Sequence, residues 1–578
     1  MPTRAVIVAQ RPPRRRRRRG RRRRLLTRSA PLLLLAACAF AIGVAVATQP
    51  GRDERQLVRA YVTDWARGRV AAMYSLLDRR SRLATSEAAF ARRLRADAQI
   101  ATLRSLAVLR VGTPHSGSVR VWMAVDTRIW GVLREPLIVP FDGSGSQARV
   151  RLASELLFPG LRAGESLTRR TELATRATIL AADGTPLAQG AGRTSPIPSV
   201  AGEIVGSLGP IPASQRAAYA ALGYPPNAQV GQDGLELALQ RRLVGRIGGV
   251  LLAGRRVLAR VAPEQAPPVR TTIDPRVEEA AIAALGGRLA GIAAIDPRTG
   301  ALEALSGIAY SAPQPPGSTM KIITATAALQ AGLVKPTTVF PYATSATLDG
   351  YTMNNAGGED CGGTLINAFA VSCNSVFAPL GARVGGSLLV GTAERYGFNH
   401  PTGIPGADES TIPPANRIGD ALAVGSSAIG QGMVLATPLE MADVAATIAM
   451  GGRRPLPTLL AGQRPRFVRV TTPRVAHEIA QMMLAVVRYG TGTSAQIPGV
   501  QVAGKTGTAE VRNSTGPPNS AAANNPRNTD SWFVAYAPAG DPRVAVAAMF
   551  ANAGYGATTA APAVRSVIEA ALGLGSAG

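Results

Sequence analysis

The spacing of apolar positions changes along the chain, and each spacing predicts a different kind of element. Residues 29–48 carry no charged side chain and are mostly apolar, which matches the roughly 20 residues that a transmembrane helix needs. Apolar residues then recur at helical spacing over 57–65 and 73–77, and β-rich stretches such as 119–125 follow. The pattern therefore predicts an uncharged span, then helices, then a sheet.

The C-terminal half predicts a larger mixed domain. The expected elements are a helix over 275–285, a hairpin over 293–300, a helical middle, late strands near 501–511, 531–536 and 544–550, and a final helix over 562–572. Helices that cover an antiparallel sheet bury the apolar face of both kinds of element. Because 578 residues leave room for several cores, we expect an α+β fold with more than one domain.

Charge is distributed unequally around the uncharged span. The formal net charge is +28, and thirteen arginines but no acidic residue lie in residues 1–28. Since basic residues stay on the cytoplasmic side of a membrane helix, we expect residues 1–28 to be a cytoplasmic tail and 29–48 a single-pass anchor in the cell membrane. The chain after Gln49 is then extracytoplasmic. A cleaved leader is the alternative, because Leu35-Ala36-Ala37-Cys38 resembles a lipoprotein cleavage box.

Ser318 stands at the expected start of a helix. Residues 315–317 are Pro-Pro-Gly and break regular structure, whereas the alanine-rich run over 319–329 favours a helix. Lys321 follows three residues later, so its amine and the Ser318 hydroxyl share one helical face. Serine becomes a useful nucleophile beside a base, and lysine becomes a base when burial or a second cation lowers its pKa.

Lysine is scarce in this chain. Only Lys321, Lys335 and Lys505 are lysines among the 64 basic residues. A guanidinium stays protonated in proteins, so arginine cannot do the work of a lysine that must release a proton. The spacing of Ser318 and Lys321 alone also occurs by accident on helices, but the scarcity of lysine favours a chemical role.

Two further motifs follow in order. Ser372-Cys373-Asn374 lies in an apolar helical run over 365–377, and Lys505-Thr506-Gly507-Thr508 follows the strand-like residues 500–503. In an ideal strand Lys505 and Thr506 face opposite sides, so one of them must reach the site from the rim or through a distortion that Gly507 permits. With Ser318 and Lys321, the set resembles the active-site signature of penicillin-binding transpeptidases and serine β-lactamases.

The resemblance covers most of the chain. Residues 268–575 resemble the transpeptidase catalytic domain of class B, high-molecular-mass penicillin-binding proteins, also through 271–275, 430–432 and 531–538. Residues 156–267 resemble the non-catalytic, dimerisation-like linker domain of that class, through Arg176 to Gly184 and Gly234-Leu235-Glu236. Residues 52–153 resemble the nuclear-transport-factor-like domain that precedes the transpeptidase in the methicillin-resistance type.

The resemblance implies roles for the motif residues. Ser318 is the nucleophile that attacks the carbonyl between two D-alanines, and Lys321 is the general base. Ser372 relays a proton to the leaving amine, and Asn374 bonds Lys321 or the substrate amide. Lys505 adds a second positive charge that lowers the pKa of Lys321, and it also holds the substrate carboxylate.

The third motif also implies substrate contacts. Thr506, Gly507 and Thr508 are expected to bind substrate, and the backbone N–H groups of Ser318 and Thr508 are expected to form the oxyanion hole. Residues 512–529, rich in Asn, Pro and Ser, are expected to be a loop at the rim of the site. No metal and no cofactor are expected.

The implied function is a membrane-anchored D,D-transpeptidase that cross-links peptidoglycan stem peptides and is acylated by β-lactams. The alternatives are a serine β-lactamase, or a β-lactam sensor or scaffold without turnover. A separate membrane glycan polymerase is the implied partner, because no segment resembles a glycan-polymerising domain. Nucleic acid is not expected, since the arginine run has no interleaved aromatic residues.

The cysteines and tryptophans leave smaller questions. Cys361 and Cys373 could form a disulfide outside the cell, or Cys373 could be only a small buried hydrophobe, and the sequence leaves both open. Trp65 and Trp122 are expected in the core, because no titratable group accompanies either of them.

Overall fold

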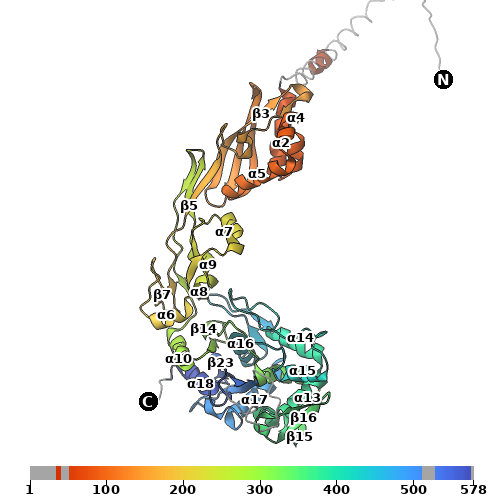
Figure 1. Ribbon diagram of the computed structural model, residues 1–578, viewed down its shortest axis with the longest axis vertical. Helices are drawn as coiled ribbons and strands as arrows, with labels where there is room; N and C mark the ends of the chain where they lie inside the picture. The colour runs from red at the N-terminus through yellow and green to blue at the C-terminus, as the bar shows by residue number, and fades with distance from the viewer. Residues whose placement is uncertain (1–33, 41–50, 511–527, 575–578) are drawn as a thin grey trace, which may run out of the picture. The chain divides into compact units, whose positions relative to one another are not determined.

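The computed structural model describes residues 34–40, 51–510 and 528–574 (Figure 1). These residues form two compact units. Unit 1 extends to Arg170 and adds Ala221–Gly223 and Gly249–Val261, and unit 2 contains the remainder. The expected cytoplasmic tail, most of the expected anchor and nearly all of the expected rim loop lie outside the described residues.

Within the described ranges, no single helix is both long enough and apolar enough to span a membrane. Two consecutive helices, α13 (Asn374–Val384) and α14 (Gly386–Tyr396), meet that criterion only as a pair and are bent by 100° at their junction.

Unit 1 contains helices followed by a sheet, as expected. Four antiparallel strands pair in the order β1-β2-β3-β4, and buried Val119, Val121 and Met123 on β2 alternate with more exposed residues. The elements are α2 (Arg52–Ala66), α3 (Val70–Ser75), α4 (Arg79–Ala84), α5 (Glu87–Ile100), β1 (Leu103–His115), β2 (Ser118–Thr127), β3 (Gly131–Asp142) and β4 (Arg149–Val150). The helices thus follow the chain order that the apolar spacing predicted.

The prediction for the tryptophans was half right. Trp65 is buried on α2, but Trp122 is 40% exposed on β2. Neighbouring side chains of a strand point to opposite faces, so Trp122 lies on the other face from Val121 and Met123. The sequence alone did not indicate which face of this sheet the helices cover.

The expected linker region supplies small sheets and short helices. Its elements are β5 (Leu167–Glu172), β6 (Ile179–Leu180), β7 (Pro186–Ala188), α6 (Pro198–Ile204), β8 (Leu208–Pro210), α7 (Arg216–Leu222), β9 (Gln229–Gly231), α8 (Gly234–Ala238), α9 (Gln240–Leu243), β10 (Gly248–Ala253) and β11 (Arg256–Val261). The next strand, β12 (Val269–Arg270), lies just beyond the expected linker and pairs with β6. The buried Glu236 accepts hydrogen bonds from Arg176 Nε at 2.8 Å and Arg193 Nε at 2.6 Å. The structure therefore joins Arg176 and Glu236, two residues of the expected linker pattern, in one buried ion cluster.

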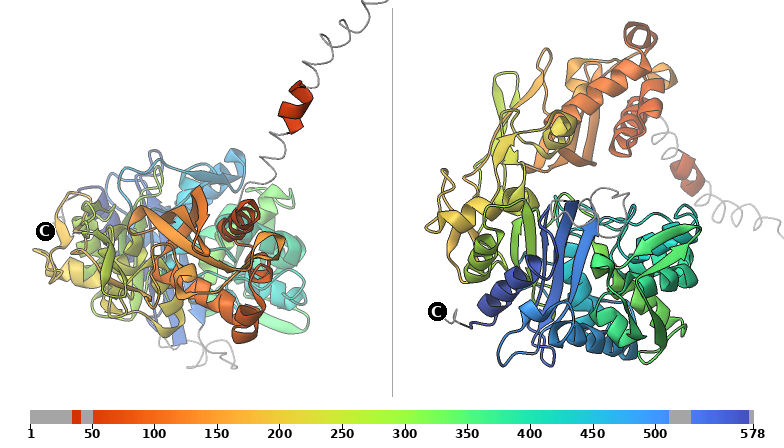
Figure 2. Two further views of the ribbon diagram at one scale, coloured as in Figure 1. Left: turned by 90° about the horizontal axis from the view of Figure 1, so that it is seen from above. Right: turned by 60° about the horizontal axis from the view of Figure 1, so that its bottom comes forward.

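A five-stranded antiparallel sheet forms the centre of the remaining part of unit 2, with the order β14-β13-β23-β22-β21. Its strands are β13 (Ala290–Ile295), β14 (Leu302–Gly307), β21 (Ala503–Glu510), β22 (Thr529–Ala537) and β23 (Val544–Phe550). The hairpin and the late strands lie where the sequence predicted them. Both faces are buried, and Figure 2 shows α18 on one side of the sheet and the helical middle on the other.

The two faces of this sheet pack in separate cores. On one face, α10 (Pro275–Leu285) and α18 (Ala560–Ala571) pack against residues such as Ile292 and Val546. On the other face, Ala293 and Ala547 contribute to the larger core that contains the helical middle. That middle contains α11 (Lys321–Gln330), α12 (Leu365–Ala370), α13, α14, α15 (Ala421–Ala428), α16 (Pro438–Ala449) and α17 (Pro473–Arg488). The helix predicted over 275–285 is confirmed, and the final helix begins two residues earlier than predicted.

Candidate active site

Ser318 lies in the turn that begins the first buried helix of the middle. The turn, η4 (Gly317–Met320), is a 3₁₀ helix and continues directly into α11. Residues three apart eclipse one another in a 3₁₀ helix, so Ser318 and Lys321 lie on the same side of the turn. The predicted position of the helix start is confirmed, although its first turn is a 3₁₀ turn and not an α-helical one. Ser318 is partly exposed, whereas Lys321 is fully buried.

Two glycines hold this turn against neighbouring backbone. Gly317 has φ +54°, and its N–H donates to the carbonyl of Gly430 at 2.9 Å. A Cβ atom on Gly317 would lie 2.7 Å from the carbonyl oxygen of Thr508, so only glycine fits there. The turn that carries Ser318 is therefore fixed directly beside β21.

Lys321 and Lys505 meet at one hydroxyl group. Lys321 Nζ donates to the Ser372 carbonyl at 2.6 Å and to Asn374 Oδ1 at 2.7 Å, and lies 3.3 Å from Ser372 Oγ. Lys505 Nζ donates to the same Ser372 Oγ at 2.8 Å and to the Thr506 carbonyl at 3.1 Å. The structure thus brings four of the predicted catalytic residues together around the Ser372 hydroxyl.

The surroundings of the two amines disfavour positive charge. Burial, and then the charge of Lys505, lower the pKa of Lys321 well below its usual range. Burial lowers the pKa of Lys505 to about 7. Among the described residues no carboxylate pairs with either amine, and the rings of Phe377 and Phe369 lie 5.6 and 5.5 Å from Lys321 and Lys505. The site therefore favours the neutral form of Lys321.

A neutral Lys321 has its lone pair in a useful direction. A neutral amine has two N–H bonds, and the Ser372 carbonyl and Asn374 Oδ1 can only accept, so they take both. The lone pair is then left for a hydroxyl, either that of Ser372 or that of Ser318 on the same side of the turn. This arrangement suits Lys321 as a proton acceptor.

The predicted helical run over 365–377 is broken at Ser372, which corrects the sequence prediction. α12 ends at Ala370, α13 begins at Asn374, and Ser372 between them has φ +64°. The left-handed conformation is costly for a residue other than glycine, on the order of 1–2 kcal/mol. Because of it, the carbonyl and the hydroxyl of Ser372 both contact Lys321. Contacts around the break hold a conformation that the local sequence disfavours.

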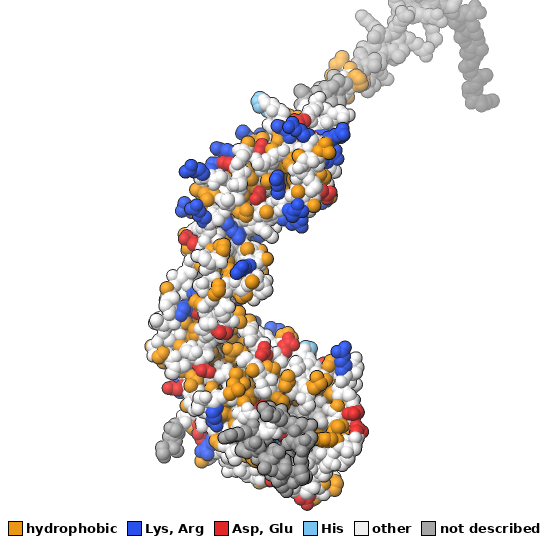
Figure 3. All heavy atoms as spheres, in the orientation of Figure 1, with side chains coloured by type: hydrophobic (Ala, Val, Ile, Leu, Met, Phe, Trp, Pro, Cys, Tyr) orange, Lys and Arg blue, Asp and Glu red, His pale blue; other side chains and the backbone are white. Residues whose placement is uncertain are grey.

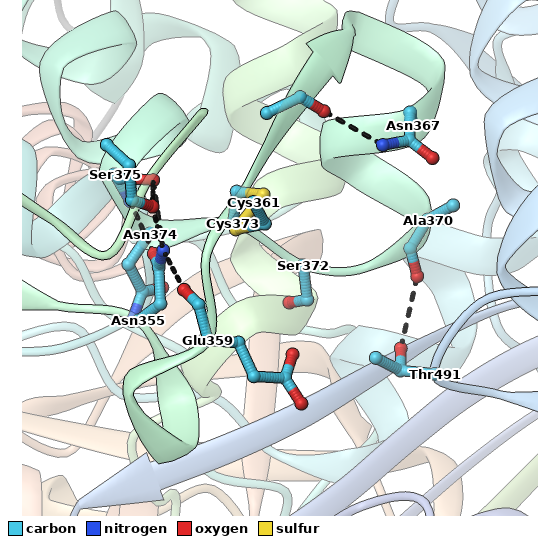
Figure 4. Close-up of a disulfide and its surroundings, with 12 residues drawn as sticks. Asn355, Glu359, Cys361, Asn367, Ala370, Ser372, Cys373, Asn374, Ser375 and Thr491 are labelled. Carbon is cyan, nitrogen blue, oxygen red and sulfur yellow. Dashed lines mark hydrogen bonds between the residues drawn. A yellow bond between two sulfur atoms is a disulfide. The ribbon is translucent and has the colours of Figure 1, made fainter. Parts of the chain in front are cut away.

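Asn355 is one of these supports, and no motif or periodicity in the sequence marks it. Its amide donates to the carbonyls of Ala343 at 2.7 Å and Glu359 at 2.8 Å, and its Oδ1 accepts from the N–H of Ser375 at 2.8 Å (Figure 4). The preceding Asn354 carbonyl accepts from Asn374 Nδ2 at 2.9 Å, which turns Asn374 Oδ1 toward Lys321. Asn355 is therefore a positioning residue for the second motif.

We expect Asn355→Ala to slow acylation by penicillin about tenfold, because the Ser375 N–H loses its acceptor and the carbonyls of Ala343 and Glu359 lose their donor. The second-order rate constant of acylation measures this effect. Asn399→Ala is the matched control, since Asn399 bonds both backbone groups of Ile412 away from the motifs. Equal slowing in both variants would mean that Asn355 contributes only to general stability.

The second support is covalent. Cys361 at the start of β18 (Cys361–Thr364) forms a disulfide with Cys373, the middle residue of the second motif (Figure 4). The question that the sequence left open is thus resolved in favour of the bond. Cys373 is also fully buried. It is therefore both a disulfide partner and a small buried residue, the two alternatives that the sequence left open.

We expect the double variant Cys361→Ala/Cys373→Ala to lose about 3 kcal/mol of unfolding free energy, because the bond closes a loop with a sequence separation of 12. Urea denaturation of wild type and variant measures this loss. An unchanged midpoint and slope in the variant would contradict the expected stabilisation.

The third motif lies on β21, an edge strand of the central sheet. The register between β21 and β22 has no irregularity from Ala503 to Glu510. The strand distortion that Gly507 would permit therefore does not occur. Lys505 reaches Ser372, while the Thr506 hydroxyl contacts that of Thr491 at 2.5 Å. Gly507 serves close packing instead, because a Cβ atom there would lie 2.8 Å from the Pro316 carbonyl oxygen.

Backbone donors converge beside Ser318. The carbonyl of Thr508 faces Gly317. Because the N–H and C=O of one strand residue point to the same side, the Thr508 N–H also faces η4, the turn that carries Ser318. The N–H of Ser318 lies in the first turn of a helix and has no intrahelical acceptor. An oxyanion hole requires two such donors beside the nucleophile, and the assignment of these two groups to it stays a prediction.

Comparisons with known proteins agree with the three motifs. Residues 290–569 match the penicillin-binding protein transpeptidase domain, and residues 184–255 match the penicillin-binding protein dimerisation domain. The peptidoglycan D,D-transpeptidase PbpA of Mycobacterium tuberculosis is 35% identical over 379 residues, covering 60% of this chain and 71% of that protein. The peptidoglycan D,D-transpeptidase MrdA of Acinetobacter baumannii is 28% identical over 365 residues, covering 53% of this chain and 54% of that protein.

Solved structures of penicillin-binding proteins are similar to this chain as well. The crystal structure of PBPA from Mycobacterium tuberculosis has a TM-score of 0.56 and 28% identity, over 69% of this chain and 99% of that one. An imipenem acyl-enzyme complex of penicillin-binding protein A from M. tuberculosis has a TM-score of 0.55 and 28% identity over the same shares.

Proposed function

We infer the function from one premise, namely that the chain belongs to the class B penicillin-binding proteins, whose members combine a dimerisation domain with a peptidoglycan D,D-transpeptidase domain. We propose that this chain cross-links peptidoglycan stem peptides through an acyl-enzyme on Ser318, and that β-lactams acylate the same serine. The observation that carries the proposal is the buried Lys321, which is held by Ser372 and Asn374 beside a second buried lysine.

The proposed reaction begins with Lys321. Its neutral amine takes the proton from Ser318 Oγ, which attacks the carbonyl carbon between two D-alanines and forms the ester bond. The C–N bond then breaks, and the Ser372 hydroxyl gives its proton to the leaving D-alanine amine while it takes the proton that Lys321 removed from Ser318. The N–H groups of Ser318 and Thr508 stabilise the oxyanion, at roughly 3 kcal/mol for each donor.

The remaining residues act on the substrate. Lys505, with Thr506, Gly507 and Thr508 at the sheet edge, is proposed to hold the substrate carboxylate. An amino group of a second stem peptide then attacks the ester, Ser318 is released, and the new peptide bond is the cross-link. A β-lactam enters by the same first step, and its opened ring stays on Ser318.

We further propose the setting of this enzyme. Residues 29–48 anchor the chain in the cell membrane with the arginine-rich tail in the cytoplasm and the domains outside. Residues 52–153 form a nuclear-transport-factor-like domain of the methicillin-resistance type, which the order of helices and strands in unit 1 supports. A separate membrane glycan polymerase supplies the glycan strands.

A labelled-penicillin chase tests the proposed activity. Purified protein is labelled with a fluorescent penicillin, excess unlabelled antibiotic is added, and the label on the protein is followed by gel. A transpeptidase should retain the label for many minutes. Rapid loss of label, together with a molar excess of hydrolysed antibiotic, would identify a β-lactamase instead.

A fusion tests the proposed setting. A reporter that is active only outside the cytoplasm, placed after Thr48, should be active in the cell. A silent reporter would overturn the topology, and a mature N-terminus at Cys38 would show a lipoprotein instead of an uncleaved anchor.

A further inference from the structure

The sheet of unit 1 has an open face that the proposed reaction does not use. Arg120, Trp122 and Ala124 on β2 point away from the buried Val121 and Met123. Trp122 is 40% exposed. A tryptophan has a large apolar ring and a polar N–H, which suits a surface that meets a partner with both apolar and polar parts.

Arginines flank this tryptophan. Arg110 on β1 pairs directly with Trp122 across the strands, and Arg120 lies two residues away on the same face of β2. Both arginines are exposed, and neither makes an ion pair or a side-chain hydrogen bond with any residue in the described ranges. Leu109, beside Arg110 at an irregularity of β1, is 52% exposed. We call Leu109, Arg110, Arg120 and Trp122 the Trp122 face.

Outside the arginine-rich residues 1–28, the positive charge of the chain is concentrated in the same unit. Residues 51–170 and 249–261 contain 24 arginines and 11 acidic residues, whereas residues 171–248 and 262–578 contain 27 basic and 25 acidic residues. Figure 3 shows basic side chains spread over the part of the chain that contains α2 and β3. The charge of unit 1 therefore favours an anionic partner.

The chain enters unit 1 at the end of this sheet where β1 turns into β2, over the helix-covered face opposite the Trp122 face. Gly51 packs on Pro114, close to the turn between β1 and β2, because a Cβ atom on Gly51 would lie 2.7 Å from Pro114 Cγ. Arg55 Nη2 on the first helix donates to the Val111 carbonyl at 3.0 Å, which fixes the helix at this end of β1. The proposed anchor ends at Thr48, only three residues before Gly51, a reach of about 10 Å. An anchor there holds this end of the sheet at the membrane surface.

We propose that the Trp122 face docks on the anionic phospholipid headgroups of the membrane in which the chain is anchored. Arg110 and Arg120 contact phosphate groups, and Trp122 enters the interfacial layer, where tryptophan is favoured. Because the short connection keeps unit 1 at the surface, weak individual contacts suffice for docking. The proposal rests on the proposed anchor but not on the proposed transpeptidase activity.

The test uses the full chain in lipid nanodiscs that contain a lipid with a nitroxide on its headgroup, which quenches nearby tryptophans. The signal of Trp122 is the difference between wild type and Trp122→Phe. We expect its quenching to be at least about twofold stronger with one-third phosphatidylglycerol than with phosphatidylcholine alone, and to weaken in 0.5 M salt because salt screens exposed charges.

Matched variants separate specific docking from net charge. Arg110→Gln/Arg120→Gln should lose the extra quenching of Trp122, whereas Arg92→Gln/Arg93→Gln on α5, with the same change of charge, should keep it. Equal quenching in both lipids would overturn the proposal and indicate a different anionic partner, such as an acidic protein segment. Equal losses in the two variants would overturn it as well.

Two controls in the same preparation keep the proposals apart. Failure of the chain to enter nanodiscs would remove the anchor and, with it, the docking proposal. If penicillin labelling is lost while the lipid-dependent quenching of Trp122 remains, the proposed transpeptidase activity is rejected and the docking proposal stands. Melting curves and circular dichroism spectra like those of the wild type show that the arginine variants are folded.

Discussion

Lys321→Arg is expected to slow acylation by penicillin about 10²- to 10⁴-fold, because the variant loses its general base. Lys321 is buried, and burial with the charge of Lys505 lowers its pKa so that it can release a proton. An arginine at this position keeps its charge at any accessible pH and cannot accept a proton from Ser318. The measurement is the second-order rate constant of acylation, after a melting curve has shown that the variant is folded.

The matched control is Lys505→Arg, which keeps the positive charge and changes only reach and geometry. We expect it to retain more of the acylation rate than Lys321→Arg, because Lys505 supplies charge while Lys321 supplies a base. Equal losses, or a milder effect at Lys321, would mean that the base is assigned to the wrong lysine.

The pH dependence gives an independent view of the same pair. Acylation needs neutral Lys321, so its rate should rise with pH through the pKa of Lys321. Lys505→Gln removes a positive charge that lowers this pKa, so the pKa rises and the rising limb should move to higher pH. A limb that stays in place would show that Lys505 does not influence the base.

Ser318→Ala is expected to abolish covalent labelling by penicillin, because no other group replaces the nucleophile in the turn before α11. Removing one small hydroxyl from a partly exposed position should leave the fold intact. Gel fluorescence after labelling and a melting curve check both expectations. Ser311→Ala, at a serine seven residues upstream, is the control and should label like the wild type.

Much of this site was predictable from the sequence because its chemistry is local. Ser318 and Lys321 share one turn, and the order of the three motifs predicted that Ser372, Asn374 and Lys505 would meet Lys321. The sheet and the helix over 275–285 were predictable as well, because their apolar spacing is strong. Each of these predictions needed only residues that are close in sequence or a motif of fixed order.

The rest depended on contacts between distant residues. Residues 365–377 have the composition of one helix, yet the break at Ser372 exists because Lys321, Asn355 and the disulfide hold it from elsewhere in the chain. Asn355 lies 20 residues before the Ser375 that it supports, and no periodicity marks it. The exposure of Trp122 depends on which face the helices cover, and strand alternation is the same in either case.

The most direct test of the account is intact-protein mass spectrometry after incubation with penicillin, followed by mapping of the modified peptide. The account predicts one added penicillin per chain, located on Ser318 and still present after many minutes. An adduct on another residue would contradict the assignment of the nucleophile. An unmodified chain in a solution of hydrolysed antibiotic would contradict the persistent acyl-enzyme that defines the proposed function.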